Sequence, residues 1–135
     1  MPWRKRPERG ALSIERRHNE SVMLRFPGYE GRVAIRACRE TAENYVAIFV
    51  ETDLPFDVAL PDEEWLPAQN NWALMGDDED IGLRFHVGED FHEVWLGVIH
   101  IAPSGTRTKL RFEAAREVEI NREEIDIAKY GQGDA

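Results

Sequence analysis

The stretch of residues 110–125 constrains the fold of this chain more than any other. Polar and apolar residues alternate over 110–114 and again over 118–120, with a break between, which predicts two strands joined by a turn. A charged run, 121–125, follows at once and is typical of the start of a helix. The C-terminal part of the chain is therefore expected to contain two strands and then a short helix.

The rest of the chain also shows strand-like alternation, interrupted by turn-forming residues. Strands are predicted over residues 11–17, 21–26, 31–39, 45–51 and 56–60. After these, Pro61 stands ahead of three acids, an arrangement that is favoured at a helix N-terminus. The sequence thus predicts an all-β fold with a short C-terminal helix.

Segments of the first half recur in the second half. Residues 20–26 match residues 79–85, and residues 54–65 lie over residues 114–125 without a gap. Such self-similarity indicates two diverged copies of one five-stranded unit. We expect a basic arm at 1–10, a first copy at 11–68, a second copy at 69–130 and a tail at 131–135, with the two copies intertwined in one domain.

Composition narrows the class of protein. The chain has 135 residues, 42% of them hydrophobic, and no long apolar run, which predicts a soluble, cytoplasmic domain without a membrane span or secretory signal. The single Cys38 is expected to be buried filler. The four histidines lack metal-ligand spacing, and no catalytic or phosphate-loop motif is present. We therefore expect a non-enzyme without metal or cofactor.

Charge is distributed unevenly along the chain. The formal net charge of −9 argues against indiscriminate nucleic-acid binding, which requires a basic face. However, residues 51–93 contain 13 acids and the single base Arg84, whereas the first 17 residues contain six bases and two acids. The sequence indicates a polarised surface rather than a uniformly acidic one.

Two tracts resemble a known family. The run Arg-Glu-Val-Glu-Ile-Asn-Arg-Glu-Glu-Ile at 116–125 resembles the signature of the carbon storage regulator (CsrA/RsmA) family, small bacterial RNA-binding proteins that grip GGA-containing loops. Residues 12–24 resemble the first two strands of that family. The resemblance implies a homodimer whose subunits are half this length, with the first strand of one subunit beside the fifth strand of the other. A tandem copy would supply the partner in the same chain, as a monomeric pseudo-dimer of two packed, antiparallel-rich sheets.

The resemblance also implies which residues bind RNA. The expected site combines the first strand of the first copy with the last strand of the second copy: Ile14, Arg16, Arg17, Arg116, Val118, Ile120, Asn121 and Arg122. Arginines can hold phosphates and guanine edges, Ile14 and Ile120 can pack on bases, and strand-edge amides and carbonyls can read unpaired purines. At the opposite corner the alignment puts Ala73, Met75–Gly76 and Pro61–Asp62 in place of the isoleucine and arginines, so only one live site is expected.

The leading interpretation is a translational regulator that binds a GGA-type loop of an mRNA or small RNA, with a protein antagonist as a further possible partner. The alternative is an interaction module of the same ancestry that has lost RNA binding and uses its acidic face to bind a basic protein. A third interpretation is a single longer unit that forms an ordinary homodimer.

Overall fold

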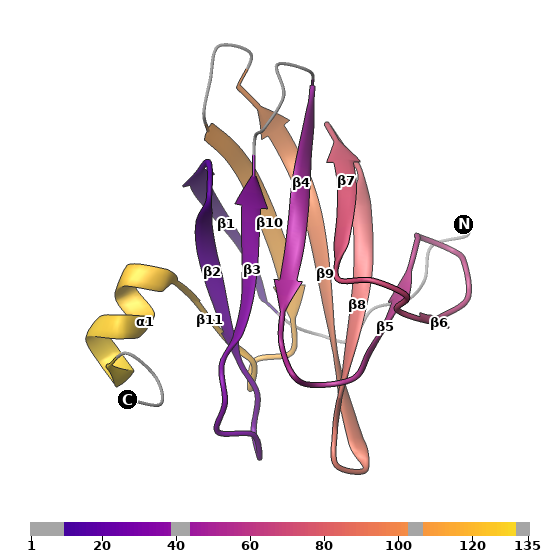
Figure 1. Cartoon of the computed structure of the whole chain (residues 1–135), viewed down its shortest axis with the longest axis vertical. Coiled ribbons are helices and arrows are strands. Elements are labelled where there is room, and N and C mark those ends of the chain that lie inside the picture. The colour runs from indigo at the N-terminus through magenta and orange to yellow at the C-terminus, as the bar shows by residue number, and fades with distance from the viewer. Residues whose placement is uncertain (1–9, 39–43, 103–106, 132–135) are drawn as a thin grey trace.

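The computed structural model describes residues 10–38, 44–102 and 107–131, which form eleven strands and one helix (Figure 1). The elements are β1 (Gly10–Arg17), β2 (Glu20–Arg25), β3 (Val33–Cys38), β4 (Tyr45–Glu51), β5 (Phe56–Ala59), β6 (Leu66–Pro67), β7 (Trp72–Gly76), β8 (Asp80–Val87), β9 (Asp90–Ile101), β10 (Arg107–Ala114), β11 (Glu119–Arg122) and α1 (Glu123–Tyr130). The prediction of a mostly β protein with a short C-terminal helix is confirmed. Residues 1–9 of the expected arm and residues 132–135 of the expected tail lie outside the described residues.

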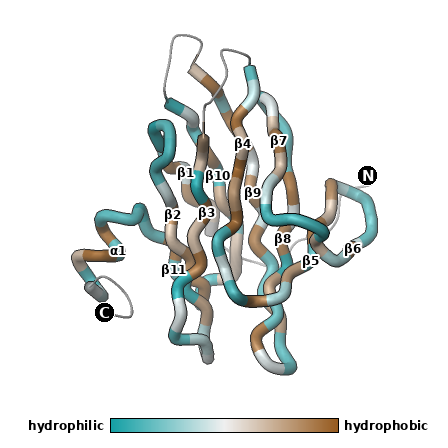
Figure 2. Tube along the Cα trace, in the orientation of Figure 1, coloured by the Kyte–Doolittle hydropathy of each residue, from teal (hydrophilic) through white to brown (hydrophobic). Residues whose placement is uncertain are grey.

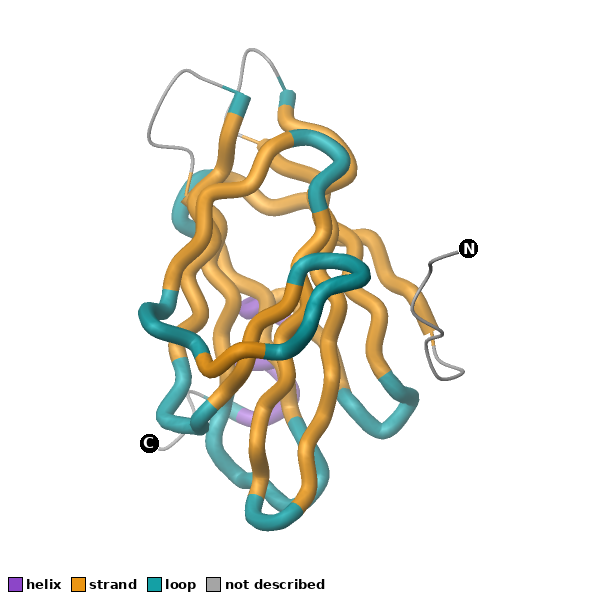
Figure 3. The backbone as a smooth tube through the Cα atoms, turned by 90° about the vertical axis from the view of Figure 1, so that its right-hand side faces the viewer, coloured by secondary structure: helices purple, strands orange, loops and turns teal. Residues whose placement is uncertain are grey.

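The strands form two antiparallel sheets that pack face to face (Figures 1 and 3). Sheet A has the order β1-β10-β9-β8-β5-β6, and sheet B has the order β11-β2-β3-β4-β7. Each sheet therefore takes strands from both halves of the chain. The strands at the ends of these orders each have one edge without a ladder partner within the described residues.

The hydrophobic core lies between the sheets. Strand β4 shows the pattern clearly, because Val46, Ile48 and Val50 are buried while the first and last residues are exposed. Figure 2 shows hydrophobic positions alternating with hydrophilic ones along the strands. Phe85 and Phe112 are fully buried in this core. Each such side chain contributes about 1.5–3 kcal/mol by leaving water.

Apart from β6, each strand of one sheet has a counterpart in the other sheet with a corresponding pairing partner. Leu24 pairs with Val33 in sheet B, as Leu83 pairs with Val94 in sheet A. Similarly, β7 pairs with β4 as β1 pairs with β10, so that Met75 and Gly76 occupy the places of Arg16 and Arg17. The sequence comparison had aligned these residues in the same way.

The gapless alignment of 54–65 with 114–125 was wrong by two residues. Val58 pairs with Leu83 just as Ile120 pairs with Leu24, so Val58, rather than Leu60, is the counterpart of Ile120. Leu60 is then the counterpart of Arg122. Pairing across the sheet, not spacing along the chain, fixes these equivalences.

The helix start predicted after Pro61 was also wrong. Residues 61–63 form a turn in which the Glu63 amide donates to the Leu60 carbonyl at 3.0 Å. Asp62 has a φ of 64°, a left-handed conformation that a right-handed helix does not contain. The strand β6 follows within a few residues, leaving no room for a helical turn.

The C-terminal helix is held against β2 by a buried ion pair. Asp126 in α1 is fully buried and accepts two hydrogen bonds from the Arg25 guanidinium, at 2.8 and 2.7 Å. The same guanidinium lies 4.0 Å from the centroid of the Tyr130 ring, which extends the contact to the last turn of the helix. Cys38 is buried in β3, as expected. In the described part of the chain, no helix has the length and apolar character needed to cross a bilayer.

Candidate nucleic-acid interface

The candidate site lies where β1 and β11 end on the same side of the molecule. The resemblance implied that these two strands lie beside each other, but β1 pairs with β10 and β11 pairs with β2. They are edge strands of different sheets, and the link between them is made by side chains. Because Arg122 ends β11 and also caps α1, with φ −57° and ψ 149°, it stands where the chain leaves the sheet and enters the helix.

Arg16 forms that link and is itself buried. Its guanidinium donates to both carboxylate oxygens of Glu124, at 3.1 and 3.0 Å, and to the Ser21 carbonyl at 3.0 Å. The hydrogen bond from Arg16 is the main reason that the pKa of Glu124 is lowered. With only 5% of its surface exposed, Arg16 braces β1 against α1. It is not a free cation for a phosphate.

Three exposed arginines gather next to this brace. Arg17, Arg107 and Arg122 line a hollow of about 270 Å³, together with Glu15, Arg16 and Glu20. Arg107 lies 3.7 Å from Glu15, a loose contact. Among the described residues, the guanidinium groups of Arg17 and Arg122 make no hydrogen bond or close ion pair, although the positive charge of Arg122 helps to lower the pKa of Glu124. Because Glu124 balances the charge of Arg16, the hollow presents the three exposed arginines against Glu15 and Glu20, and it is locally basic on a chain of net charge −9.

The other predicted site residues are distributed differently. Ile14 and Val118 belong to the core and are 4% and 6% exposed, so neither presents a face to a base. Ile120 is half-buried against the same core. Asn121 donates to Glu119 at 2.9 Å. Arg116 is exposed in the turn before β11, at the end of that strand remote from Arg122.

Sequence reasoning missed Arg107. The residue opens β10 and is the register partner of Arg17, so that both side chains reach the hollow from neighbouring strands. The signal was the order of the strands: pairing the first strand with residues 107–114 places these two arginines opposite each other. The glutamates Glu20 and Glu124 were missed for a different reason, since each matters only as a partner of Arg16 or of the Arg17 amide.

The opposite corner of the molecule has a hollow of about 540 Å³ with the reverse charge. It contains Met75, the counterpart of Arg16, and Leu60, the counterpart of Arg122. Four acids and no base line it within the described residues: Glu63, Asp78, Glu79 and Asp80. An anion would be repelled from this corner.

No group of three or more His, Cys, Asp or Glu side chains is placed to hold a metal ion within residues 10–38, 44–102 and 107–131. Comparison with known proteins gave no match to any family model, to any curated protein or to any solved structure.

Proposed function

We propose that this chain is a fused pseudo-dimer of the carbon storage regulator type, which binds a GGA-containing single-stranded RNA loop through one corner and thereby modulates translation. The proposal is supported by the strand order, since each sheet combines the first and fifth strands of one half with the second, third and fourth strands of the other. Such an exchange interlocks the two halves, as the fusion of two subunits requires, although β1 and β11 do not pair as the resemblance implied.

The single observation that carries the proposal is the difference between the two corners. Arg17, Arg107 and Arg122 surround one hollow, whereas the register counterparts of Arg17 and Arg122 at the other corner are Gly76 and Leu60. The counterpart of Arg107 is Tyr45. If these arginines served only to keep the chain soluble, there would be no reason for all three to gather at one of the two corresponding corners.

The chemistry of this corner suits an unpaired RNA segment. Guanidinium groups bind phosphate oxygens and the O6/N7 edge of guanine through paired N–H donors. Beside them, β1 and β11 are edge strands, whose main-chain donors and acceptors are available to the Watson–Crick edges of unstacked bases. Arg16 and Glu124 contribute by fixing the position of Arg17 relative to Arg122, not by contacting RNA.

The proposal is tested by titrating a hairpin with a GGA loop and measuring both affinity and stoichiometry. We expect one RNA per chain, and a loss of about tenfold or more for each of Arg17→Ala, Arg107→Ala and Arg122→Ala, since a good bidentate contact contributes about 1–3 kcal/mol. The matched control is Arg111→Ala, which removes a half-exposed arginine of β10 that pairs with Glu113 away from the hollow.

Two results would contradict the proposal. One is a stoichiometry of two RNAs per chain, which requires a second site at the acidic corner. The other is a CCA loop that binds as tightly as the GGA loop, with all four arginine variants weakened equally. That outcome would indicate phosphate attraction without recognition, and its affinity would fall steeply with salt.

The acidic hollow favours a second candidate function, binding of a basic protein segment. Its four carboxylates and its exposed Leu60 and Leu74 would suit a peptide that alternates basic and apolar residues. Asp78→Asn combined with Asp80→Asn should abolish such binding while leaving the GGA titration unchanged. If Arg122→Ala reduced peptide binding as much as the double aspartate variant does, the peptide would instead bind at the basic corner.

A further inference from the structure

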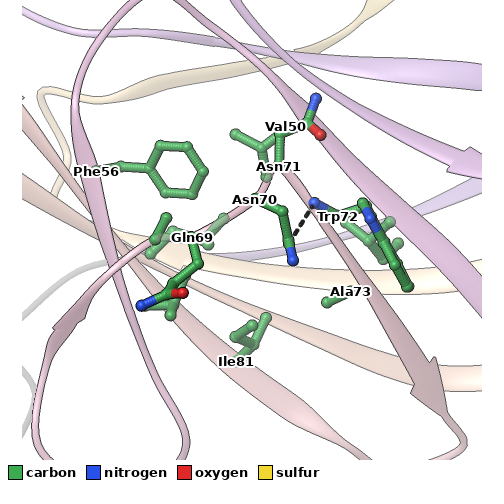
Figure 4. Close-up of a pocket in the computed structure, with 12 residues that line it drawn as sticks. Val50, Phe56, Gln69, Asn70, Asn71, Trp72, Ala73 and Ile81 are labelled. Atoms are coloured by element: carbon green, nitrogen blue, oxygen red, sulfur yellow. Dashed lines mark hydrogen bonds between the residues drawn. The ribbon is translucent and has the colours of Figure 1, made fainter.

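An apolar pocket of about 100 Å³ lies between the sheets on the side where β5 and β8 face β4 and β7 (Figure 4). We call it the seam pocket, because the segment 68–71 that joins β6 to β7 crosses it. Val58 and Ile81 line it from sheet A, and Val50 and Ala73 line it from sheet B. Figure 4 shows Phe56 and Trp72 on opposite sides of it, with Asn70 between them in that view. This side of the molecule is the one opposite α1.

The seam pocket exists because the two halves fill corresponding positions with side chains of different size. Ala73 pairs with Ile48 as Ile14 pairs with Leu110, so Ala73 is the counterpart of Ile14. Val50 pairs with Ile35 as Phe112 pairs with Leu96, so Val50 is the counterpart of Phe112. Ile14 and Phe112 are buried and occupy the space in their half. Alanine and valine are several carbon atoms smaller and leave it open.

Phe56 is larger than the residue at the corresponding position of the other half, but its ring does not fill the pocket. If the register of β11 is extended back by one residue, Phe56 is the counterpart of Val118, and its larger side chain could have filled the space. Its ring instead packs on Phe85, with the ring centroids 5.5 Å apart. The smaller side chains therefore leave the apolar walls of this open pocket without close neighbours on one side. A ligand that enters the pocket would supply the missing contacts.

The mouth of the seam pocket is polar and firmly held. The Ala68 amide donates to the Phe56 carbonyl at 3.0 Å, and the Val50 amide donates to the Asn71 carbonyl at 2.8 Å, so the segment is tied to both sheets. The Asn70 side chain accepts a hydrogen bond from the Trp72 amide at 3.3 Å. Gln69 is exposed at the same mouth. Apolar walls below a rim of side-chain amides are the usual composition of a small-molecule site.

We propose that the seam pocket binds a compact apolar ligand that consists of one aromatic ring system, a single ring or two fused rings, with a single hydrogen-bonding group. The ring would lie against Val50, Ala73 and Ile81, and its polar group would meet the Gln69 amide. Apolar cavities of this order stay dry and take up molecules such as benzene, whose known engineered site measures about 150 Å³. The proposal does not depend on RNA binding, because it uses neither the arginines nor the β1–β11 side.

The experiment uses indole and benzene as probes, with two-dimensional amide NMR of the full chain. We expect saturable shifts confined to residues around the seam pocket, and a melting temperature that rises with probe concentration, as linkage requires. Ala73→Ile should raise the melting temperature without any probe and weaken both probes at least tenfold, because it supplies the side chain that the other half already has. Ala11→Ile, at an exposed position of β1, is the matched control and should change neither.

A second variant keeps the test decisive if Ala73→Ile does not fold. Gln69→Ala alters only an exposed side chain, and it should weaken indole several-fold while leaving benzene unchanged, since benzene has no polar group. The proposal is overturned if neither probe shifts the lining residues of the wild-type chain. It is equally overturned if Ala73→Ile takes up both probes as well as the wild type does, or if Gln69→Ala leaves indole binding unchanged.

Discussion

Removal of the Asp126 carboxylate should weaken the packing of α1 against β2. Asp126 has no exposed surface and accepts both hydrogen bonds of the Arg25 guanidinium, which is itself 17% exposed. The hydrogen bond to Asp126 is also the main cause of the raised pKa of Arg25, so this cation stays charged at every accessible pH. In Asp126→Ala, the guanidinium would keep its charge and lose its partner.

The size of the effect follows from this burial. Breaking a buried pair by removing one partner costs about 3–5 kcal/mol, and the partial exposure of Arg25 favours about 3 kcal/mol. A chain of this length has an unfolding entropy near 0.3 kcal/mol per kelvin at its midpoint, so the melting temperature should fall by roughly 10 °C. This is a large part of a total stability of about 5–15 kcal/mol.

Urea unfolding of Asp126→Ala, Arg25→Ala and the double variant would measure the interaction directly. We expect the double variant to lose clearly less than the sum of the single variants, with a coupling of about 1–3 kcal/mol. If the losses instead add to within about 0.5 kcal/mol, the two side chains do not act as a pair, and the reasoning about helix docking is refuted.

Three further predictions concern stability. The pKa of Glu119 is lowered to about 2, chiefly by the hydrogen bond from Lys129, so the stability from this carboxylate should be complete above its ordinary pKa of 4.5 and be lost as the pH falls through about 2. The pKa of Glu124 is lowered by the hydrogen bond from Arg16, so its contribution to stability should likewise be lost on acidification below 4.5. Urea midpoints from pH 6 to pH 2 would show this, and Glu119→Gln should flatten the profile; an unchanged profile would show that this carboxylate is not responsible. Gly82→Ala should destabilise by about 1–3 kcal/mol in a thermal melt, because its Cβ would lie 2.8 Å from ring atoms of Trp65 and Trp95; a neutral result would mean that the two indoles move aside freely. Thr108→Val should raise the urea midpoint and increase the free energy of unfolding by about 1 kcal/mol, because the buried Thr108 hydroxyl has no hydrogen-bond partner among the described residues. Valine also fits this kind of position, since the counterpart of Thr108 in sheet B is Val46. A loss of stability would point to a hydrogen bond made by that hydroxyl in solution.

Local patterns predicted most of the elements, because alternation with period two is a property of each strand by itself. The predicted strand at 45–51 has the bounds of β4, and the other four in the first half differ from β1, β2, β3 and β5 by a few residues at most. The partner of β1 was not predictable in this way. Gly10 pairs with Ala114, and no short-range signal in either segment specifies the other.

The candidate site could have been predicted more fully from the same alternation. Ile14 and Arg16 are two residues apart and so lie on one face of β1, the face that the core requires for isoleucine. Arg16 therefore had to point inward, where a carboxylate must accompany it, and Arg17 had to point outward. The family resemblance treated the two arginines alike, which hid this difference. Arg107 lies outside the two resembling tracts and needed the strand pairing to be found.

The long separation between β1 and β10 has a consequence during protein synthesis. When Arg17 leaves the ribosome, β10, the strand that pairs with β1, has not yet been translated. Likewise, β11 is translated long after β2, its partner in sheet B. Nascent chains with open strand edges are prone to aggregate. The edges of β1 and β2 therefore stay open until β10 and β11 have been made, and the emerging polypeptide needs protection from aggregation until then.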